Sequence, residues 1–147
     1  MAKATTQKFS ELVLEVSDDG GTTWAKLCGL VDVEITRTSN IDTAEVPDCA
    51  DETLPLSLEK QVRSIEVSVS ASGVWAQESH GTMMDWFYSS AAKDARLGNL
   101  NAASGETEYE TGMALLASLN NARTKGQKVS ASIELQFDGT PTRTAKA

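Results

Sequence analysis

Two segments of the chain alternate between apolar and polar side chains with a period of two, which constrains the fold more than any other feature. In residues 61–75 the apolar positions are Ile65, Val67, Val69 and Ala71. The positions between them carry Glu66, Ser68, Ser70 and Ser72. Residues 128–137 repeat the pattern, and their polar positions are Ser130, Ser132, Glu134 and Gln136. Because successive side chains of a strand point to opposite faces, both segments predict β-strands with one apolar and one polar face.

The remaining segments complete a mainly β pattern with one helix. Strands are also predicted at 11–16, 22–30, 31–36 and 111–121, with a weaker one at the start of 95–110. Residues 78–94 change period, because Met83, Phe87 and Ala91 recur at four-residue steps and indicate an amphipathic helix. Turn sequences such as SDDGG separate the strands. The sequence therefore predicts an antiparallel β-sandwich or partial barrel of about seven strands with one flanking α-helix.

Residues 39–60 fit neither period and predict a long extended loop, which we call the arm. Its 22 residues include two prolines, six carboxylates and a single lysine. Loops of this length in a compact domain are usually functional or disordered.

Length and composition bound the class of protein. At 147 residues one domain is expected over residues 1–147, with flexible termini at 1–9 and 140–147. The net charge of −8 argues against a protein that wraps nucleic acid, because such binding depends on basic groups. Two cysteines make no disulfide framework, and Cys28 is interpreted as a small buried residue near a strand end. Without a signal peptide or an apolar run of ~20 residues, a cytoplasmic protein without a membrane anchor is expected.

No pattern of residues predicts catalysis, a cofactor or a metal site. The single histidine, His80, lies in a Ser/Gly-rich helix start, where a solvated turn residue is a simpler interpretation than a catalytic base. The acid pairs Asp18–Asp19 and Asp51–Glu52 lie in turn or loop sequences. The DCADE sequence lacks the spacing of an EF-hand loop, and no glycine-rich phosphate loop is present. We therefore expect a protein that assembles, and not an enzyme.

Four stretches, taken in order, resemble a known family. They are TTWAKLCGLVDVEITRTSNIDTAEVPD, RSIEVSVSASGVW, MMDWFYSS and GMALLASLNNARTKGQKVSASIELQFDGTPT. In this order they resemble the major tail tube proteins of long-tailed bacteriophages and of phage-derived particles such as gene transfer agents. The resemblance runs over about residues 10–142.

The resemblance implies a structural protein of the virion tail that is assembled in the bacterial host cytoplasm. Subunits of the family form hexameric rings, which stack into a tube with a continuous inner β-barrel. The tube encloses the tape measure protein and later conducts double-stranded DNA without sequence-specific binding. Implied partners are therefore further copies of the chain, the tape measure protein, and the tail terminator and distal tail proteins.

The resemblance and the polar strand faces together give candidate site residues. The lumen-lining candidates are Glu66, Ser68, Ser70, Ser130, Ser132 and Glu134. The candidates for inter-subunit contacts of the arm are Ile41, Asp42, Val46, Leu54, Leu56 and Leu58. Outward glutamates would make a lumen negative, so that DNA slides past the wall without adhering to it.

Two other interpretations remain open at this stage. The chain can be a different β-sandwich tail component, such as a terminator, a distal tail protein or the tube protein of a contractile system. It can also be a carbohydrate-binding β-sandwich module, although such modules often present exposed aromatic side chains on one face. Stacked rings or hollow tubes of the purified protein would separate a tube protein from such a module.

Overall fold

The computed structural model of the protein describes residues 2–27 and 29–147, which form eight β-strands, one α-helix and a short 3-10 turn. The strands are β1 (Leu12–Ser17), β2 (Ala25–Lys26), β3 (Leu30–Val46), β4 (Ser57–Val74), β5 (Lys93–Asn99), β6 (Thr107–Ala122), β7 (Ser130–Phe137) and β8 (Thr142–Ala145). The helix α1 spans Gln77–Ser89, and the 3-10 turn η1 spans Phe9–Glu11. The interpretation of Cys28 lies outside the described residues.

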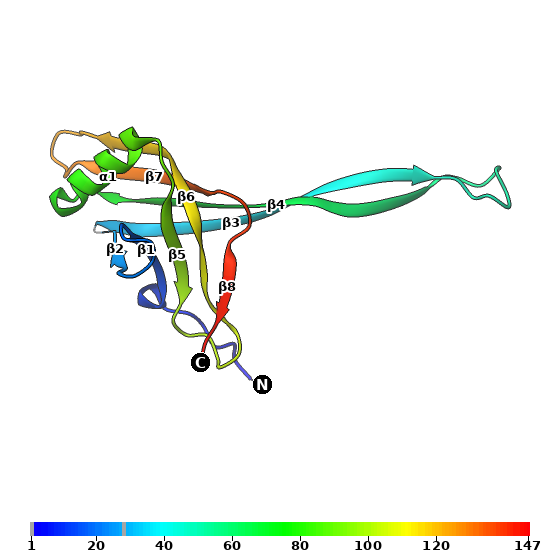
Figure 1. The fold of residues 1–147 in the computed structure, drawn as a ribbon, viewed down its shortest axis with the longest axis horizontal. Helices are drawn as coiled ribbons and strands as arrows, with labels where there is room; N and C mark the ends of the chain where they lie inside the picture. Colours follow the sequence, from blue (N-terminus) through cyan, green and yellow to red (C-terminus); the bar gives the residue numbers. More distant parts are fainter. Residues whose placement is uncertain (1, 28) are drawn as a thin grey trace.

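All eight strands belong to one open antiparallel sheet of order β2-β1-β5-β6-β7-β4-β3, with β8 paired to β6 (Figure 1). Strand β6 connects two parts of this sheet. Its first half, Tyr109–Ala114, pairs with β5, and its second half, Ala114–Ala122, pairs with β7. The two parts of the sheet cross each other (Figure 1). The predicted mainly β partial barrel with a single helix is confirmed.

The apolar core lies between the two parts of the sheet and beneath α1. Its buried side chains come from β1, β4, β5, β6, β7 and α1, and those from β4 and β7 are Val67, Val69, Ala71, Ile133, Leu135 and Phe137. These are alternate positions, so the period of two correctly predicted which face of each strand is buried. Val69 and Leu135 are opposite each other and are both fully buried.

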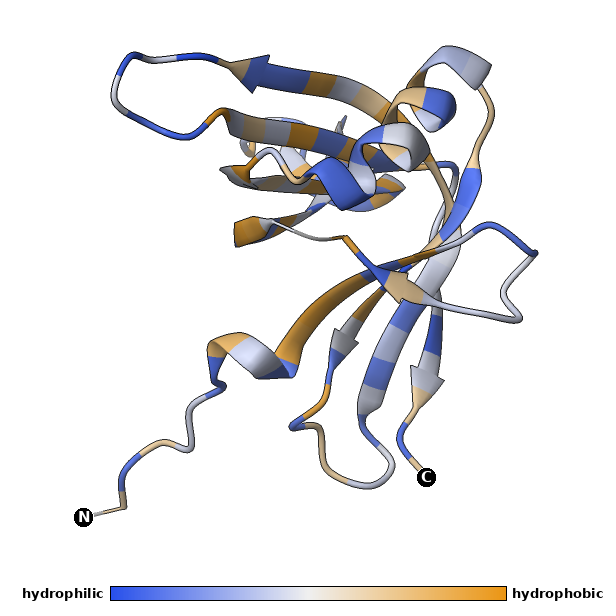
Figure 2. Ribbon diagram, turned by 90° about the vertical axis from the view of Figure 1, so that its left-hand side faces the viewer, coloured by the Kyte–Doolittle hydropathy of each residue, from blue (hydrophilic) through white to orange (hydrophobic). Residues whose placement is uncertain are grey.

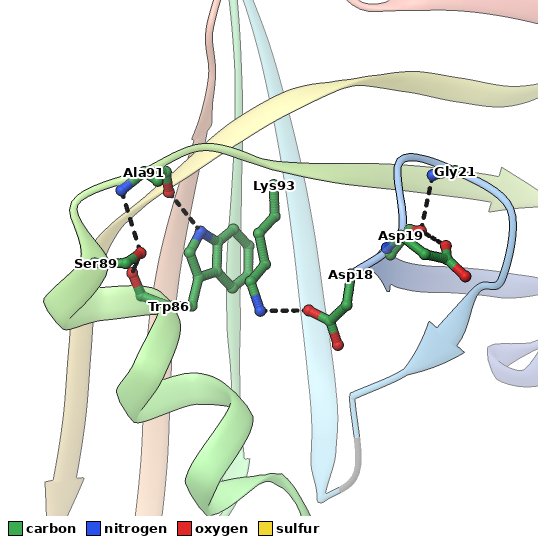
Figure 3. A network of polar contacts seen from close by, with 8 residues as sticks. Asp18, Asp19, Gly21, Trp86, Ser89, Ala91 and Lys93 are labelled. Atoms are coloured by element: carbon green, nitrogen blue, oxygen red, sulfur yellow. Dashed lines mark hydrogen bonds and ion pairs between the residues drawn. The ribbon is translucent and has the colours of Figure 1, made fainter.

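The buried face of helix α1 shares only Met83 with the predicted stripe of Met83, Phe87 and Ala91. The buried helix residues are Met83 and Trp86, whereas Phe87 and Tyr88 are exposed. The helix ends at Ser89, so Ala91 lies outside it. Ala91 instead accepts a hydrogen bond of 3.1 Å from Trp86 Nε1 through its carbonyl oxygen (Figure 3). The indole ring is therefore buried while its N–H group is hydrogen-bonded. This favours Trp86, and not Phe87, as the helix side chain that packs against the sheet.

Three segments differ from the sequence-based prediction. Most of the arm is strand, because 39–46 belongs to β3 and 57–60 belongs to β4. A two-stranded ribbon exposed on both faces needs no alternation of apolar and polar residues, so the sequence of these two strands does not show the period of two. Of the described residues in the predicted strand 22–30, Ala25–Lys26 forms β2 and Leu30 begins β3, and the others are not strand. The C-terminal tail, expected to lack regular structure, forms β8 on the edge of β6.

Residues 2–8 form no helix or strand. Within the described part of the chain, no helix combines the length and apolar character that crossing a membrane requires.

Trp86→Ala is expected to lower the free energy of unfolding by about 3–5 kcal/mol, because it leaves a large cavity under α1. Tyr88→Ala is the matched control, since Tyr88 lies on the same helix and is 74% exposed. It is expected to change the free energy of unfolding by no more than about 0.5 kcal/mol. Denaturant unfolding of both variants is the measurement, and equal losses would contradict the assignment of the buried face.

Candidate assembly interface

One face of the four-strand segment β3-β4-β7-β6 is polar from edge to edge. Cross-strand register places two rows on it, Asp32–Ser72–Ser132–Asn120 and Glu34–Ser70–Glu134–Ser118. The opposite face carries the apolar rows Val33–Ala71–Ile133–Leu119 and Ile35–Val69–Leu135–Leu116. Strands β3, β4 and β7 keep the period of two through these rows, and a register shift between Leu116 and Ser118 brings β6 into phase with them. Burial of the apolar rows therefore fixes the polar rows on the outside.

A shallow groove of about 520 Å³ runs over this polar face. Among the described residues that line it, the charged ones are all acidic: Asp32, Glu34 and Glu134. These carboxylates come from β3 and β7, with the serine hydroxyls of β4 between them. The face therefore presents negative charge and small hydroxyl groups to solvent.

Most of the predicted lumen-lining residues lie together on the polar face. Ser68, Ser70, Ser132 and Glu134 occupy its middle, and Ser130 lies at the end of β7. Glu66 lies beyond β7, opposite Thr38. Asp32 and Glu34 were not among the candidates. Their outward direction follows from alternation in 31–36, but only the pairing of β3 with β4 adds them to this face.

The arm is a free β-ribbon that projects from the body of the protein (Figure 1). Strand β4 pairs with β7 only over Ser68–Val74. From Arg37 opposite Val67 to Val46 opposite Ser57, β3 and β4 pair only with each other in the described structure. At ~3.3 Å per residue, this ribbon extends roughly 30 Å before its tip begins. A two-stranded ribbon alone is at best marginally stable in water, so a surface that receives it is expected.

Six large apolar side chains of the arm and its root are exposed, namely Ile41, Leu54, Leu56, Leu58, Val62 and Ile65. Ile41 is directly opposite Val62 on the ribbon. Exposed apolar side chains that form large patches are typical of surfaces that bind a partner. Of the other predicted arm residues, Asp42 forms a 3.9 Å ion pair with Arg63, and Val46 is half-buried at the end of β3.

The tip of the arm, residues 47–56 between β3 and β4, is shaped by its own carboxylates. Asp48 accepts hydrogen bonds from the backbone N–H groups of Ala50 and Asp51, at 2.8 and 3.1 Å. Asp51 accepts hydrogen bonds from the hydroxyl and the backbone N–H of Thr53, and these bonds lower the pKa of Asp51. The tip therefore has a defined turn and stays negatively charged at neutral pH.

An ion pair fixes the root of the arm. The Arg37 guanidinium on β3 donates two hydrogen bonds to the Glu110 carboxylate on the first half of β6. This bonding raises the pKa of Arg37. Because the Arg37 side chain is 55% exposed, the pair contributes little to overall stability. Its geometric effect is to join β3 to the other part of the sheet where the ribbon leaves the body.

Two long strand edges have no partner in the described structure. Strand β3 pairs only with β4, and β6 beyond Ala114 pairs only with β7. These are the two outer edges of the polar four-strand segment. Open edges expose rows of unpaired N–H and C=O groups, which pair readily with another chain.

The described residues contain no group of three or more His, Cys, Asp or Glu side chains placed to hold a metal ion. His80 Nδ1 accepts a hydrogen bond of 3.2 Å from Trp75 Nε1. The imidazole therefore has a structural partner at the start of α1, where the sequence suggested a solvated turn residue.

The sequence model of the family described as phage tail tube protein matches residues 6–143. A comparison of the sequence with curated proteins found no match. Among solved structures, a chain from the tail of an empty gene transfer agent (GTA) particle with C6 symmetry aligns with a TM-score of 0.76 and 16% identity. That alignment covers 95% of this chain and 100% of the other.

Two further structures are similar in fold. A chain of the SPP1 tail tube aligns with a TM-score of 0.68 and 11% identity, over 96% of this chain and 80% of that one. A chain from the sheath–tube complex of an extracellular contractile injection system aligns with a TM-score of 0.63 and 16% identity, over 96% of this chain and 93% of that one. At these identities the likeness is one of fold.

Proposed function

Because the chain belongs to the phage tail tube protein family and is a structural tail tube protein, we propose that its copies form hexameric rings that stack into the tube of a virion tail. The observation that carries the proposal is the four-strand segment β3-β4-β7-β6, which has one polar face and two free edges. The C6 symmetry of the GTA tail that the chain resembles in fold supports a ring of six.

The strand directions suit a closed ring. Each neighbouring pair in β3-β4-β7-β6 is antiparallel, so the two outer strands, β3 and β6, run in opposite directions. When two copies stand in the same orientation, β6 of one therefore meets β3 of the next in antiparallel fashion. This is a head-to-tail interface, which forms a ring when the rotation between copies closes. Ring closure would pair the open edges of β3 and β6 and reduce the hazard of aggregation at them.

In such a ring the polar face lines the lumen, because the other face is already buried in the core of each subunit. Asp32, Glu34 and Glu134 then give the wall a repeating negative charge. Phosphates are repelled at short range, within a Debye length of ~8 Å at physiological salt. Such a wall would hold the tape measure protein before ejection and afterwards let double-stranded DNA pass without adhering.

The arm gives the ring a means of joining to another subunit. Its apolar residues are exposed on a ribbon that cannot fold back onto its own body, because β3 and β4 carry it outward as continuous strands (Figure 1). Docked on a neighbour, Leu54, Leu56 and Leu58 bury apolar area at about 25 cal/mol per Å². The acidic side chains keep the undocked ribbon soluble.

Negative-stain electron microscopy of the purified protein tests the proposal most directly. We expect hollow tubes or stacked rings with a central channel. Monomers that remain monodisperse at high concentration would contradict it.

Reversing the charge of the lumen tests the role of the polar face. Glu34→Lys/Glu134→Lys is expected to permit tube formation but to reduce DNA release by about tenfold, because the lysines would bind phosphates. Counterion release makes such binding weaker in salt, so raising the ionic strength should restore release. Particle titre and the rate of DNA ejection are the measurements, and Glu34→Gln/Glu134→Gln is the matched neutral control. Normal ejection by the lysine variant at low salt would count against a lumenal position.

Shortening the arm tests its role in stacking. Asp42 is directly opposite Gln61, so residues 43–60 can be replaced by an Asn-Gly turn that closes a two-residue hairpin. We expect a folded monomer, measured by circular dichroism and thermal unfolding, that forms no stacked tubes. Leu54→Ser/Leu56→Ser/Leu58→Ser keeps the length and charge of the arm and should also weaken stacking. Tubes of normal length from the shortened protein would refute this role.

A further inference from the structure

An apolar groove runs along the open seam of the sheet, between β1 and β3. It has a volume of about 240 Å³ between the two strands and continues into a recess of about 170 Å³ beside η1. Its apolar lining consists of Phe9, Leu12, Val13, Leu14, Leu27, Leu30 and Val33. Figure 2 shows the hydrophobic strand that follows the 3-10 turn on this side of the molecule. Phe9, at the mouth, is 71% exposed.

The groove has a basic rim. Lys26 lines the part between the strands, and Lys8 lines the recess beside η1. Among the described residues that line either part, none is acidic. The groove therefore combines an apolar floor with positive charge at its edge, the reverse of the acidic polar face.

The tip of the arm has the complementary chemistry. Leu54, Leu56 and Leu58 are 49–60% exposed and recur at every second position. Acidic residues flank them in the sequence, and residues 42–59 contain six carboxylates and no lysine or arginine. The hydrogen bonds that Thr53 donates to Asp51 keep the tip in a defined turn, so less ordering is needed on binding.

The occupant cannot be the chain's own arm. Val33 lines the groove, and β3 runs without interruption from Val33 to Val46, where the tip begins. At ~3.3 Å per residue, the tip therefore starts roughly 40 Å from its own groove. Figure 1 shows the ribbon directed away from the body. A second copy of the chain is the molecule that brings both surfaces together.

We propose that the seam groove between β1 and β3 of one subunit receives the arm tip of a second subunit, with Leu54, Leu56 and Leu58 on the apolar floor and the arm carboxylates beside Lys8 and Lys26. The proposal rests on the proposed tube assembly and names the receiving surface within it. It also gives the open seam an occupant: the arm tip covers the apolar side chains left exposed where β1 and β3 do not pair.

Crosslinking through a natural cysteine tests the proposal. Cys49 is an exposed free cysteine at the arm tip. Ser10 lies at the groove and is exposed, so Ser10→Cys supplies a second thiol there. Thr124→Cys, in the exposed β6–β7 turn, is the matched control. Assembled tubes of each variant and of the unmodified protein are treated with a short bismaleimide, and the joined peptides are identified by mass spectrometry.

We expect Cys49 to join position 10 of another copy in assembled Ser10→Cys tubes, and not position 124 in Thr124→Cys tubes. Tubes in which Cys49 joins position 124 equally well, or joins neither position, would overturn the groove assignment and leave the tube function standing. If the unmodified protein forms no tubes under any condition, the proposed function fails, and this inference fails with it.

A charge exchange provides an independent readout. Lys8→Glu/Lys26→Glu should raise the protein concentration needed for tube assembly by about tenfold, because it puts like charges at the rim. Glu52→Lys/Glu59→Lys should raise the assembly concentration by a similar factor. Asp48 and Asp51 are left unchanged, because their hydrogen bonds shape the tip. Combining all four substitutions should return the assembly concentration to within about threefold of the unmodified protein. Additive losses in the combined variant would overturn the proposal.

Discussion

Antiparallel hydrogen bonding between β3 and β4 continues from Leu30 opposite Gly73 to Val46 opposite Ser57, well past the last residue of any other strand beside them. The first part of this pair is embedded in the body, and the second part is the arm. The pair is closely fitted at the end opposite the arm, where a Cβ at Gly73 would collide with the Gly29 carbonyl oxygen. Gly29 has φ +87°, in the left-handed region that favours glycine. Between this end and the arm, β4 is anchored by the buried side chains of Val67 and Val69, so the arm continues the direction of a strand held in the core.

The same pairing makes the polar face continuous. Burial of Val69 and Leu135 orients β4 and β7, and the register between strands carries this orientation to Glu34 on β3 and to Ser118 on β6. Acidic side chains without basic neighbours are tolerated here because the face is hydrated. In the proposed tube, such a face would need no specific contact with what passes it, which suits a conduit better than a binding site.

The open edges, the free ribbon and the unfilled seam all leave the single subunit incomplete. Each is costly for an isolated chain: unpaired backbone groups on β3 and β6, exposed leucines on the arm, and an apolar groove beside β1. Each also has a complementary surface elsewhere on the same chain, because the edges are antiparallel to each other and the acidic tip matches the basic rim. Assembly of identical copies would satisfy all three without any other partner.

The sequence by itself determined the class of fold and the faces of its central strands, because the period of two in 61–75 and 128–137 reports directly which side chains are buried. It also determined the arm's composition and carried the family resemblance. It did not determine that residues 39–46 and 57–60 are strands, because a ribbon hydrated on both faces leaves no pattern of burial. Nor did it place Arg37 against Glu110 or Trp86 against the carbonyl of Ala91. Those contacts, the shared polar face and the seam groove arise from strand order and register, which bring distant segments together and which only the tertiary structure decides.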